Sequence, residues 1–226
     1  MALHSRGRPA EPSGQPTGGR GKASCYSFQS NTNMTTLGEG GAITTNDEQF
    51  AECLRQRKTF GYVYGPQPRI VSIGFNYRMT KVQCAVGLTQ LAKVDRVIAR
   101  RLELFRLMHA LLEGVQEIVR PAGIGPGHAC HLYVLPLDTD KVRFDRAALL
   151  NALKSRYGVG CAIHYPAVWT WEALAERDYS EQRARCPIAA KTCREMFSLP
   201  LSAHTTSEDC DYIAWAMKQS LHELNQ

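Results

Sequence analysis

The sequence predicts an α/β protein whose C-terminal part is a small α/β domain with an antiparallel or mixed sheet. Two patterns predict it. Short runs of alternating apolar and polar residues bounded by glycine or proline indicate strands, and apolar residues three or four positions apart indicate helices. With 226 residues, of which 44% are hydrophobic, the chain can bury the core of one large or two small domains.

The first predicted elements are a strand, a polar loop and a tight turn within residues 27–45. The glycine cluster Gly38-Glu39-Gly40-Gly41 precedes the strand-like run Ala42-Ile43-Thr44-Thr45. Small residues let the backbone approach a ligand, and the loop hydroxyls, Ser27 among them, can donate hydrogen bonds to a phosphate. Taken alone, the glycine cluster favours an ordinary hairpin turn.

Helical spacing then predicts helices over residues 47–60 and 81–112, separated by a segment at 61–68 that is rich in glycine and proline. The second pattern is long and has few helix breakers, with apolar residues such as Val86, Val94 and Ile98 at helical spacing. We expect a single spine helix that crosses from a large to a small domain. Such a helix also favours a homodimer contact.

Shorter elements alternate after residue 115. We expect strands at 129–137, 159–163 and 197–199, and helices at 145–156, at 187–196 and from 206 to about 221. Gly158 can take the left-handed conformation that closes a helix. Thr206-Ser207-Glu208-Asp209 is similar to a capping box at a helix start.

Composition excludes several classes of function. The net charge is +6, but no aromatic-interleaved basic patch accompanies the N-terminal arginines, so we expect no nucleic-acid partner. Without a run of eighteen apolar residues or an apolar signal core, we expect a cytoplasmic protein with no membrane partner. Eight cysteines are spread singly, without a Cys-x-x-Cys pair, so we expect neither disulfides nor a metal site.

The loop region carries a longer motif. Residues 27–41 read Ser-Phe-Gln-Ser-Asn-Thr-Asn-Met-Thr-Thr-Leu-Gly-Glu-Gly-Gly. This resembles the DegT/DnrJ/StrS family of pyridoxal phosphate (PLP) dependent sugar aminotransferases of fold type I, which read roughly Ser-Phe-x-x-x-Lys-Asn-x-Thr-Thr-x-Gly-Glu-Gly-Gly. Further matches are Gly74-Phe75-Asn76-Tyr77-Arg78-Met79, His131-Leu132-Tyr133, His164-Tyr165-Pro166 and Ser198-Leu199-Pro200-Leu201. The resemblance covers nearly all of residues 25–221.

The resemblance implies PLP as cofactor and a site at three positions. It places the family's Schiff-base lysine on Thr32 and its phosphate-binding serine on Ser27. It places on Asn76 an asparagine that reaches the cofactor phosphate of the partner subunit. The lysine amine forms an imine with PLP and then moves the substrate proton. A threonine hydroxyl does neither, so we expect position 32 to be incompetent for transamination.

In the family about half of the polypeptide precedes the lysine, whereas thirty-one residues precede Thr32. We therefore expect a truncated PLP-transferase-like large domain followed by the small α/β domain. Residues 1–24 would be a disordered basic arm rich in glycine, proline and arginine. Residues 25–103 would be the remnant of the PLP-binding domain with the start of the spine helix, and residues 104–226 the small C-terminal domain.

The resemblance also implies a substrate site that includes His164, Tyr165 and Tyr62. His164 ends a predicted strand beside a turn that Pro166 stiffens, which favours an imidazole that faces a site. A structural histidine with satisfied hydrogen bonds is the alternative. Tyr62 can stack on a sugar or nucleotide, or simply anchor its loop.

The leading hypothesis is an impaired aminotransferase, related to enzymes that make amino-sugars from nucleotide-linked keto-sugars with glutamate as donor, and acting as a homodimer. The alternative is a non-catalytic remnant that dimerises or binds a partner or a sugar nucleotide. A nucleic-acid binder that uses the basic arm is a third hypothesis, which predicts salt-dependent affinity.

Overall fold

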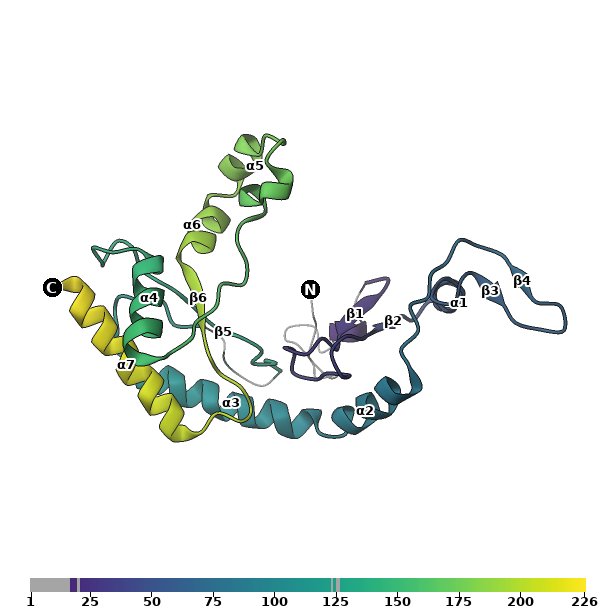
Figure 1. Ribbon diagram of the computed structural model, residues 1–226, viewed down its shortest axis with the longest axis horizontal. Helices are drawn as coiled ribbons and strands as arrows, with labels where there is room; N and C mark the ends of the chain where they lie inside the picture. The colour runs from purple at the N-terminus through teal and green to yellow at the C-terminus, as the bar shows by residue number, and fades with distance from the viewer. Residues whose placement is uncertain (1–16, 20, 123, 125–126) are drawn as a thin grey trace. The chain divides into compact units, whose positions relative to one another are not determined.

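The chain divides into two units, and the division in the sequence falls inside one helix (Figure 1). The computed structural model describes residues 17–19, 21–122, 124 and 127–226. Most of the predicted basic arm, residues 1–16 and 20, lies outside the described residues. Unit 1 comprises the residues up to Ala99 and the segment Gly125–His131. Unit 2 comprises Arg100–Ile124 and Leu132–Gln226.

The described elements are of mixed α/β type, as predicted, and their paired strands are antiparallel. Unit 1 contains η1 Thr17–Gly19, β1 Ser24–Ser27, β2 Gly41–Thr44, α1 Glu48–Arg57, β3 Tyr62–Val63, β4 Arg69–Ile70 and α2 Lys81–Leu91. Helix α3, Val94–Leu111, runs into unit 2, which continues with β5 Tyr133–Pro136, α4 Arg146–Tyr157, η2 Val168–Thr170, η3 Glu172–Leu174, α5 Ser180–Arg185, α6 Pro187–Glu195, β6 Met196–Leu199 and α7 Ser207–Asn225. Across the described residues, no helix combines the length and apolar character that crossing a bilayer requires.

The predicted strand, polar loop and turn are present in unit 1. Strands β1 and β2 pair with Ser27 opposite Gly41, and residues 28–40 form the loop between them. A Cβ on Gly41 would lie 2.8 Å from the carbonyl oxygen of Tyr26. Glycine is therefore required here because the two backbones approach closely.

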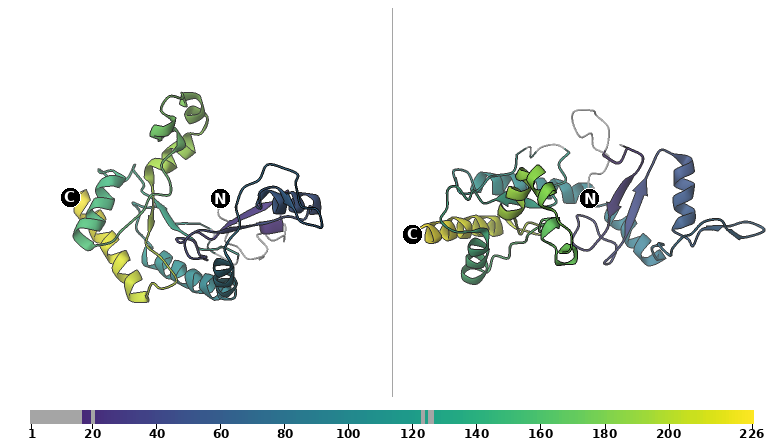
Figure 2. Two further views of the ribbon diagram at one scale, coloured as in Figure 1. Left: turned by 45° about the vertical axis from the view of Figure 1, so that its right-hand side comes forward. Right: turned by 90° about the horizontal axis from the view of Figure 1, so that it is seen from above.

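Helix α1 ends earlier than predicted. It begins after Asp47, whose side chain accepts a hydrogen bond from the Phe50 N–H at 2.9 Å. Phe60 and Gly61 then take φ values of 58° and 77°, which lie in the left-handed region and stop the helix before residue 60. The β3–β4 hairpin follows and projects beyond α1 (Figure 2, right).

The prediction of one spine helix over residues 81–112 is wrong, because α2 and α3 are separate helices. At the junction the Ala92 N–H bonds to the Leu88 carbonyl at 3.1 Å, whereas the Lys93 N–H bonds to the Gln90 carbonyl at 3.0 Å. The spacing of the hydrogen bonds tightens from four residues to three, as in a 3₁₀ turn, and the α-helix is interrupted.

The core of unit 2 forms around the C-terminal half of α3. Its fully buried large side chains come from α3, the turn after it, β5, α4, β6 and α7, and they include Leu104, Phe105, Met108, Leu112, Tyr133, Leu135, Leu149, Leu153, Phe197 and Met217. The Phe105 and Tyr133 rings meet edge to face with centroids 5.0 Å apart. Helix α4 packs against α7, and the two lie side by side in both views of Figure 2.

The small sheet of unit 2 is shorter than predicted. Strand β5 pairs with β6, but the predicted strand at 129–137 begins only at Tyr133, because Cys130 has a φ of 48°. The predicted strand at 159–163 is wrong. Only Ala162 pairs with Ser198, since the Val159 N–H is already bonded to the carbonyl of Leu153 at the end of α4.

The predicted caps of α4 and α7 are confirmed. Gly158 closes α4 with a φ of 66°, in the left-handed conformation. Thr206 and Asp209 form both bonds of a capping box at the start of α7. Helix α7 then continues to Asn225, four residues beyond the predicted end.

Gly74 offers a direct test of the packing at the end of α1. A Cβ at Gly74 would lie 2.3 Å from the Gly61 nitrogen and 2.7 Å from the Arg57 carbonyl oxygen. We expect Gly74→Ala to lower the local free energy of unfolding by about 1–3 kcal/mol, because the backbone must shift. Amide hydrogen exchange of residues 57–77 measures it. In Gly65→Ala the added Cβ meets nothing within 4 Å, so this control should show no loss; equal losses would contradict the account.

Candidate functional site

The loop at residues 28–40 is closed by backbone hydrogen bonds. The Phe28 N–H donates to the Gly40 carbonyl at 2.8 Å, and the Thr36 N–H donates to the Phe28 carbonyl at 3.1 Å. Thr36 is fully buried, and its hydroxyl donates to the Glu39 carbonyl at 3.1 Å. Gly87 of α2 lies over it, since a Cβ there would be 3.0 Å from the Thr36 methyl group. Thr36 therefore holds the loop in shape and is not available to a phosphate.

Thr32 lies at the centre of this loop, with its hydroxyl turned inward. Its Oγ1 is 2.7 Å from the carbonyl oxygen of Gln29, 2.7 Å from that of Met34 and 3.4 Å from that of Ser27. All three neighbours can only accept, so the single hydroxyl hydrogen is shared among them. The loop thus brings Thr32 and Ser27 together, and the Thr32 hydroxyl links the backbone of its own turn.

The chemistry of residue 32 does not fit a covalently held PLP. An imine with an aldehyde requires an amine, and threonine has none. Lys22, which precedes the loop in the sequence, directs its ammonium over the Phe50 ring at 4.9 Å from the centroid. The loop therefore has a hydroxyl where the resemblance leads one to expect the anchoring amine.

Hydroxyl donors for an anion remain in the loop. The Ser27 Oγ accepts a hydrogen bond from the Gln29 N–H at 3.3 Å and keeps its own hydrogen. The Thr35 hydroxyl is buried and has no hydrogen-bond partner in the described part of the chain. A buried hydroxyl without a partner is uncommon and calls for one from outside.

Asn76 and Tyr62 lie elsewhere in unit 1. Asn76 forms a β-bridge with Thr59, and its side-chain oxygen accepts a hydrogen bond from the Arg78 Nε at 3.0 Å. Tyr62 is half-buried and stacks on Tyr64, with ring centroids 5.6 Å apart and planes 23° apart. No hydrogen bond of the described residues ties either of them to Thr32.

The side chain of Asn33 connects the loop to residues 129 and 131. Its side-chain nitrogen donates to the Ala129 carbonyl at 2.7 Å, and its side-chain oxygen lies 3.2 Å from the His131 Nδ1. Both partners belong to the segment that is assigned to unit 1. Asn33 therefore clamps residues 129–131 to the loop.

His164 is held by Ser198 in unit 2. The His164 Nδ1 lies 2.8 Å from the Ser198 Oγ, which in turn lies 3.2 Å from the Ala162 carbonyl oxygen. The carbonyl can only accept, whereas the Ser198 hydroxyl can donate to either neighbour. When its hydrogen goes to Ala162, the Ser198 oxygen accepts from the Nδ1–H of His164, and the other ring nitrogen, Nε2, carries a lone pair.

The surroundings of His164 complete this second group. Tyr165 is 70% exposed, and its ring stands edge-on to the His164 imidazole with centroids 5.3 Å apart. Burial raises the pKa of the nearby Cys161 thiol to about 12, so this thiol is no nucleophile at neutral pH. The group therefore offers one imidazole and one exposed aromatic ring.

The expected site residues fall in both units. Ser27, Thr32, Tyr62 and Asn76 belong to unit 1, and His164 and Tyr165 belong to unit 2. Sequence reasoning missed the contributions of Ser198 and Asn33. Both lie in motifs quoted above, Ser198 in Ser198-Leu199-Pro200-Leu201 and Asn33 beside residue 32, but a motif does not indicate which distant atoms a side chain contacts.

The chain is similar to known proteins over most of its length. Residues 2–218 match the model of the DegT/DnrJ/EryC1/StrS aminotransferase family. The spore coat polysaccharide biosynthesis protein SpsC of Bacillus subtilis strain 168 is 29% identical over 212 residues, which cover 89% of this chain and 54% of SpsC. The chain thus spans about half the length of the curated relative it matches.

Solved structures agree on the fold. PseC of Helicobacter pylori, an aminotransferase involved in the biosynthesis of pseudoaminic acid, superposes with a TM-score of 0.84 at 22% identity, covering 94% of this chain and 57% of PseC. Spr1654 of Streptococcus pneumoniae in its PLP form gives a TM-score of 0.83 at 21% identity, covering 94% of this chain and 55% of that one. Because the family model spans nearly the whole sequence, the chain belongs to the DegT/DnrJ/EryC1/StrS aminotransferase family.

Proposed function

We propose that this chain is a sugar aminotransferase relative that is impaired in transamination at residue 32. Its relatives would be enzymes that make amino-sugars from nucleotide-linked keto-sugars with glutamate as donor. One observation carries the proposal: the Thr32 hydroxyl is 2.7 Å from two backbone carbonyl oxygens of its own loop. The residue supplies neither an amine for an imine nor a base for proton transfer.

The loop keeps an anion-binding character in this proposal. Ser27 and the buried Thr35 hydroxyl offer hydrogens to a phosphate, as does the Asn76 amide, which the resemblance assigns to the partner subunit's site. PLP would then bind without its covalent anchor. Non-covalent contacts alone give weaker and reversible binding.

His164 and Tyr165 supply the sugar-recognition half of the proposal. The Nε2 lone pair of His164 accepts a hydrogen bond from a sugar hydroxyl, and the exposed Tyr165 ring offers an apolar face. Tyr62, stacked on Tyr64, is a second aromatic face in unit 1. A sugar nucleotide is the ligand class that these groups favour.

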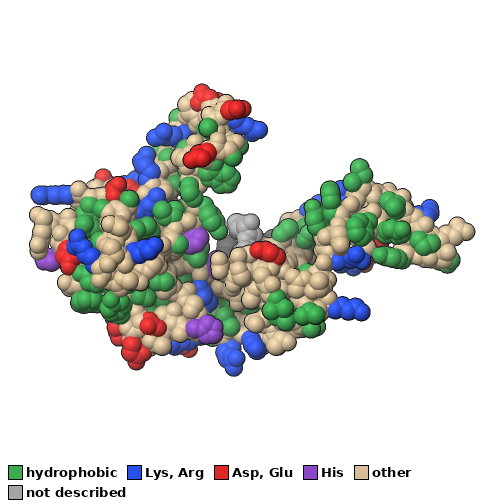
Figure 3. Space-filling view, in the orientation of Figure 1, with side chains coloured by type: hydrophobic (Ala, Val, Ile, Leu, Met, Phe, Trp, Pro, Cys, Tyr) green, Lys and Arg blue, Asp and Glu red, His purple; other side chains and the backbone are tan. Residues whose placement is uncertain are grey.

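We also propose a homodimer, in line with the resemblance, built on the predicted domain at residues 25–103. Large apolar side chains are exposed on α2 and on residues 70–77, among them Val82, Leu88, Ile73 and Tyr77. Figure 3 shows hydrophobic side chains gathered on the part of unit 1 that carries β3 and β4. Contiguous apolar surface of this kind favours association with a second copy. Light scattering of the purified chain tests it, and a monomer at micromolar concentration would contradict it.

The alternative function is a non-catalytic remnant that only dimerises or binds a partner. It shares the fold and the apolar surface of the first proposal. The two differ in whether the loop still accepts the cofactor once an amine is restored at residue 32.

Restoring the amine is the direct test. We expect no imine absorption band when the parent chain is mixed with PLP, and a band in Thr32→Lys that borohydride reduction traps on residue 32, identified by peptide mass mapping. Thr32→Met removes the same hydroxyl without adding an amine and serves as the control. A parent band trapped on Lys22 or Lys58 would overturn the proposal. No band in Thr32→Lys would favour the remnant.

Ser198 provides a test of the sugar-binding half. We expect nitrogen-15 NMR of the parent above neutral pH to show His164 with its hydrogen on Nδ1, because the Ser198 oxygen accepts it. Ser198→Ala should lose this preference and cost about 1 kcal/mol of stability. Ser220→Ala is the matched control, since Ser220 is also fully buried but its hydroxyl has no partner among the described residues. A parent with the hydrogen on Nε2 would refute the arrangement.

A further inference from the structure

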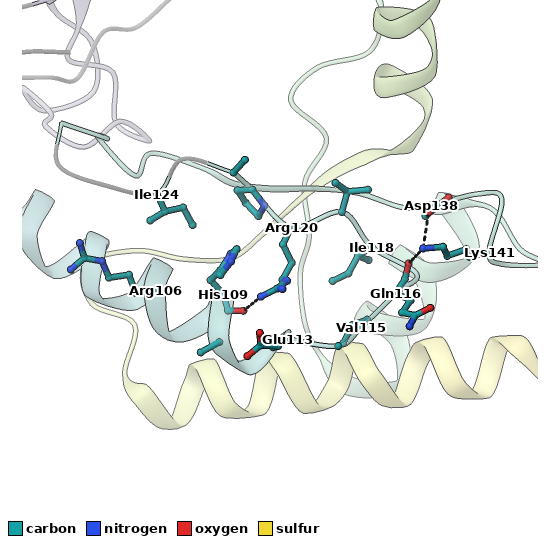
Figure 4. Close-up of a pocket in the computed structure, with 15 residues that line it drawn as sticks. Arg106, His109, Glu113, Val115, Gln116, Ile118, Arg120, Ile124, Asp138 and Lys141 are labelled. Atoms are coloured by element: carbon teal, nitrogen blue, oxygen red, sulfur yellow. Dashed lines mark hydrogen bonds and ion pairs between the residues drawn. The ribbon is translucent and has the colours of Figure 1, made fainter. Parts of the chain in front are cut away.

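Unit 2 contains a cavity of about 950 Å³ beside the C-terminal half of α3 (Figure 4). One wall is the face of α3 and its following turn that carries Arg106, His109 and Glu113, and the others are residues 115–122 and the turn at 138–141. The volume lies in the range of small-molecule sites. Its walls include none of the residues that the resemblance assigns to the cofactor or the substrate, so the cavity is separate from the Thr32 and His164 groups.

Arg120 is a fixed cation in this cavity. Its Nη1 donates to the carbonyl oxygen of His109 at 2.8 Å, and Figure 4 shows its side chain directed toward that carbonyl. A guanidinium has five N–H donors, so most of them remain for a ligand. Burial raises the pKa of Tyr133 to about 12, and the nearby Arg120 charge acts in the opposite direction. A positioned guanidinium of this kind is a receptor for an oxyanion.

His109 contributes a buried polar atom. Its Nδ1 is buried yet makes no hydrogen bond with the described part of the chain. Leaving such a group unpaired is costly. His109 and Arg120 are already linked through the His109 carbonyl, so their two polar groups belong to one end of the cavity.

The other charged residues of the cavity indicate which further groups a ligand carries. Lys141 lies at the end of the cavity lining away from Arg106 (Figure 4). Its ammonium group is 3.2 Å from the Gln116 carbonyl oxygen and 3.4 Å from the Asp138 carboxylate. Asp138 therefore neutralises Lys141, whereas Glu113 forms no ion pair within the described residues. A carboxylate without a cation accepts hydrogen bonds from hydroxyl groups. Val115, Ile118 and Ile124 add apolar wall.

We propose that this cavity binds a small phosphate ester of a polyol, such as a sugar phosphate or a nucleotide. The phosphate takes the Arg120 guanidinium, and the ligand hydroxyls donate to Glu113. The apolar wall covers the sugar or base. A free carboxylate ligand has the same oxyanion chemistry, but an amino acid fills little of a cavity of about 950 Å³.

Calorimetric titration of the full chain tests this site with adenosine 5′-monophosphate, glucose 6-phosphate, inorganic phosphate and glutamate as probes. We expect at least one of the two esters to bind more tightly than inorganic phosphate or glutamate. Arg120→Met should weaken ester binding by tenfold or more. Arg194→Met removes the same charge from an exposed position on α6, outside the cavity walls, and should leave binding unchanged.

Because Arg120 also caps the end of α3, a second variant keeps the test decisive if Arg120→Met fails to fold. Glu113 is exposed, so Glu113→Gln should fold and should weaken ester binding while leaving inorganic phosphate unaffected. Three results would each overturn the proposal. They are an equal loss of ester affinity in Arg194→Met, unchanged ester affinity in both cavity variants, and tighter binding of glutamate than of the esters. Thr32→Lys should not alter ester binding here, which separates this site from the proposed function.

Discussion

The one hydrogen that a hydroxyl group carries constrains both groups of candidate residues. In the loop of unit 1, three carbonyl oxygens surround the Thr32 hydroxyl, so its hydrogen is committed to the backbone. In unit 2 the Ser198 hydroxyl lies between the His164 Nδ1 and the Ala162 carbonyl, so the direction of its single hydrogen decides which tautomer of His164 the contact favours. When that hydrogen goes to Ala162, the Ser198 oxygen accepts from His164 and leaves a lone pair on Nε2.

The shape of the loop also depends on that hydroxyl. Thr32 bridges two carbonyls of its turn, Thr36 closes the loop under α2, and Asn33 clamps it to residues 129–131. A lysine at residue 32 would lack the short hydroxyl that joins Gln29 to Met34. Threonine therefore gives this turn internal hydrogen bonds that an extended amine would direct elsewhere.

The sequence predicted those features that a few neighbouring residues determine. The caps at Gly158 and Thr206 were readable because a left-handed glycine and a capping box each need only a few neighbouring residues. The break between α2 and α3 was not, because residues 92–93 contain neither glycine nor proline. No strand forms at 159–163 because the Val159 N–H bonds to the end of α4 and not to a sheet. The apolar periodicity of the sequence does not indicate which of these two partners the N–H takes. The contacts of Ser198 with His164 and of Asn33 with residues 129 and 131 join residues that are distant in sequence. The cavity beside α3 corresponds to no motif in the sequence.

The core of unit 2 is built from the elements of that unit. The buried core of that unit draws on α3, β5, α4, β6 and α7, and its large side chains are contributed by unit 2 itself. Arg101 adds a hydrogen bond from α3 to the Leu201 carbonyl at 3.0 Å, within the same unit. His164, held by Ser198, and Arg120, held by the end of α3, are both positioned by that core. The positions of both side chains are therefore set by elements of unit 2 itself.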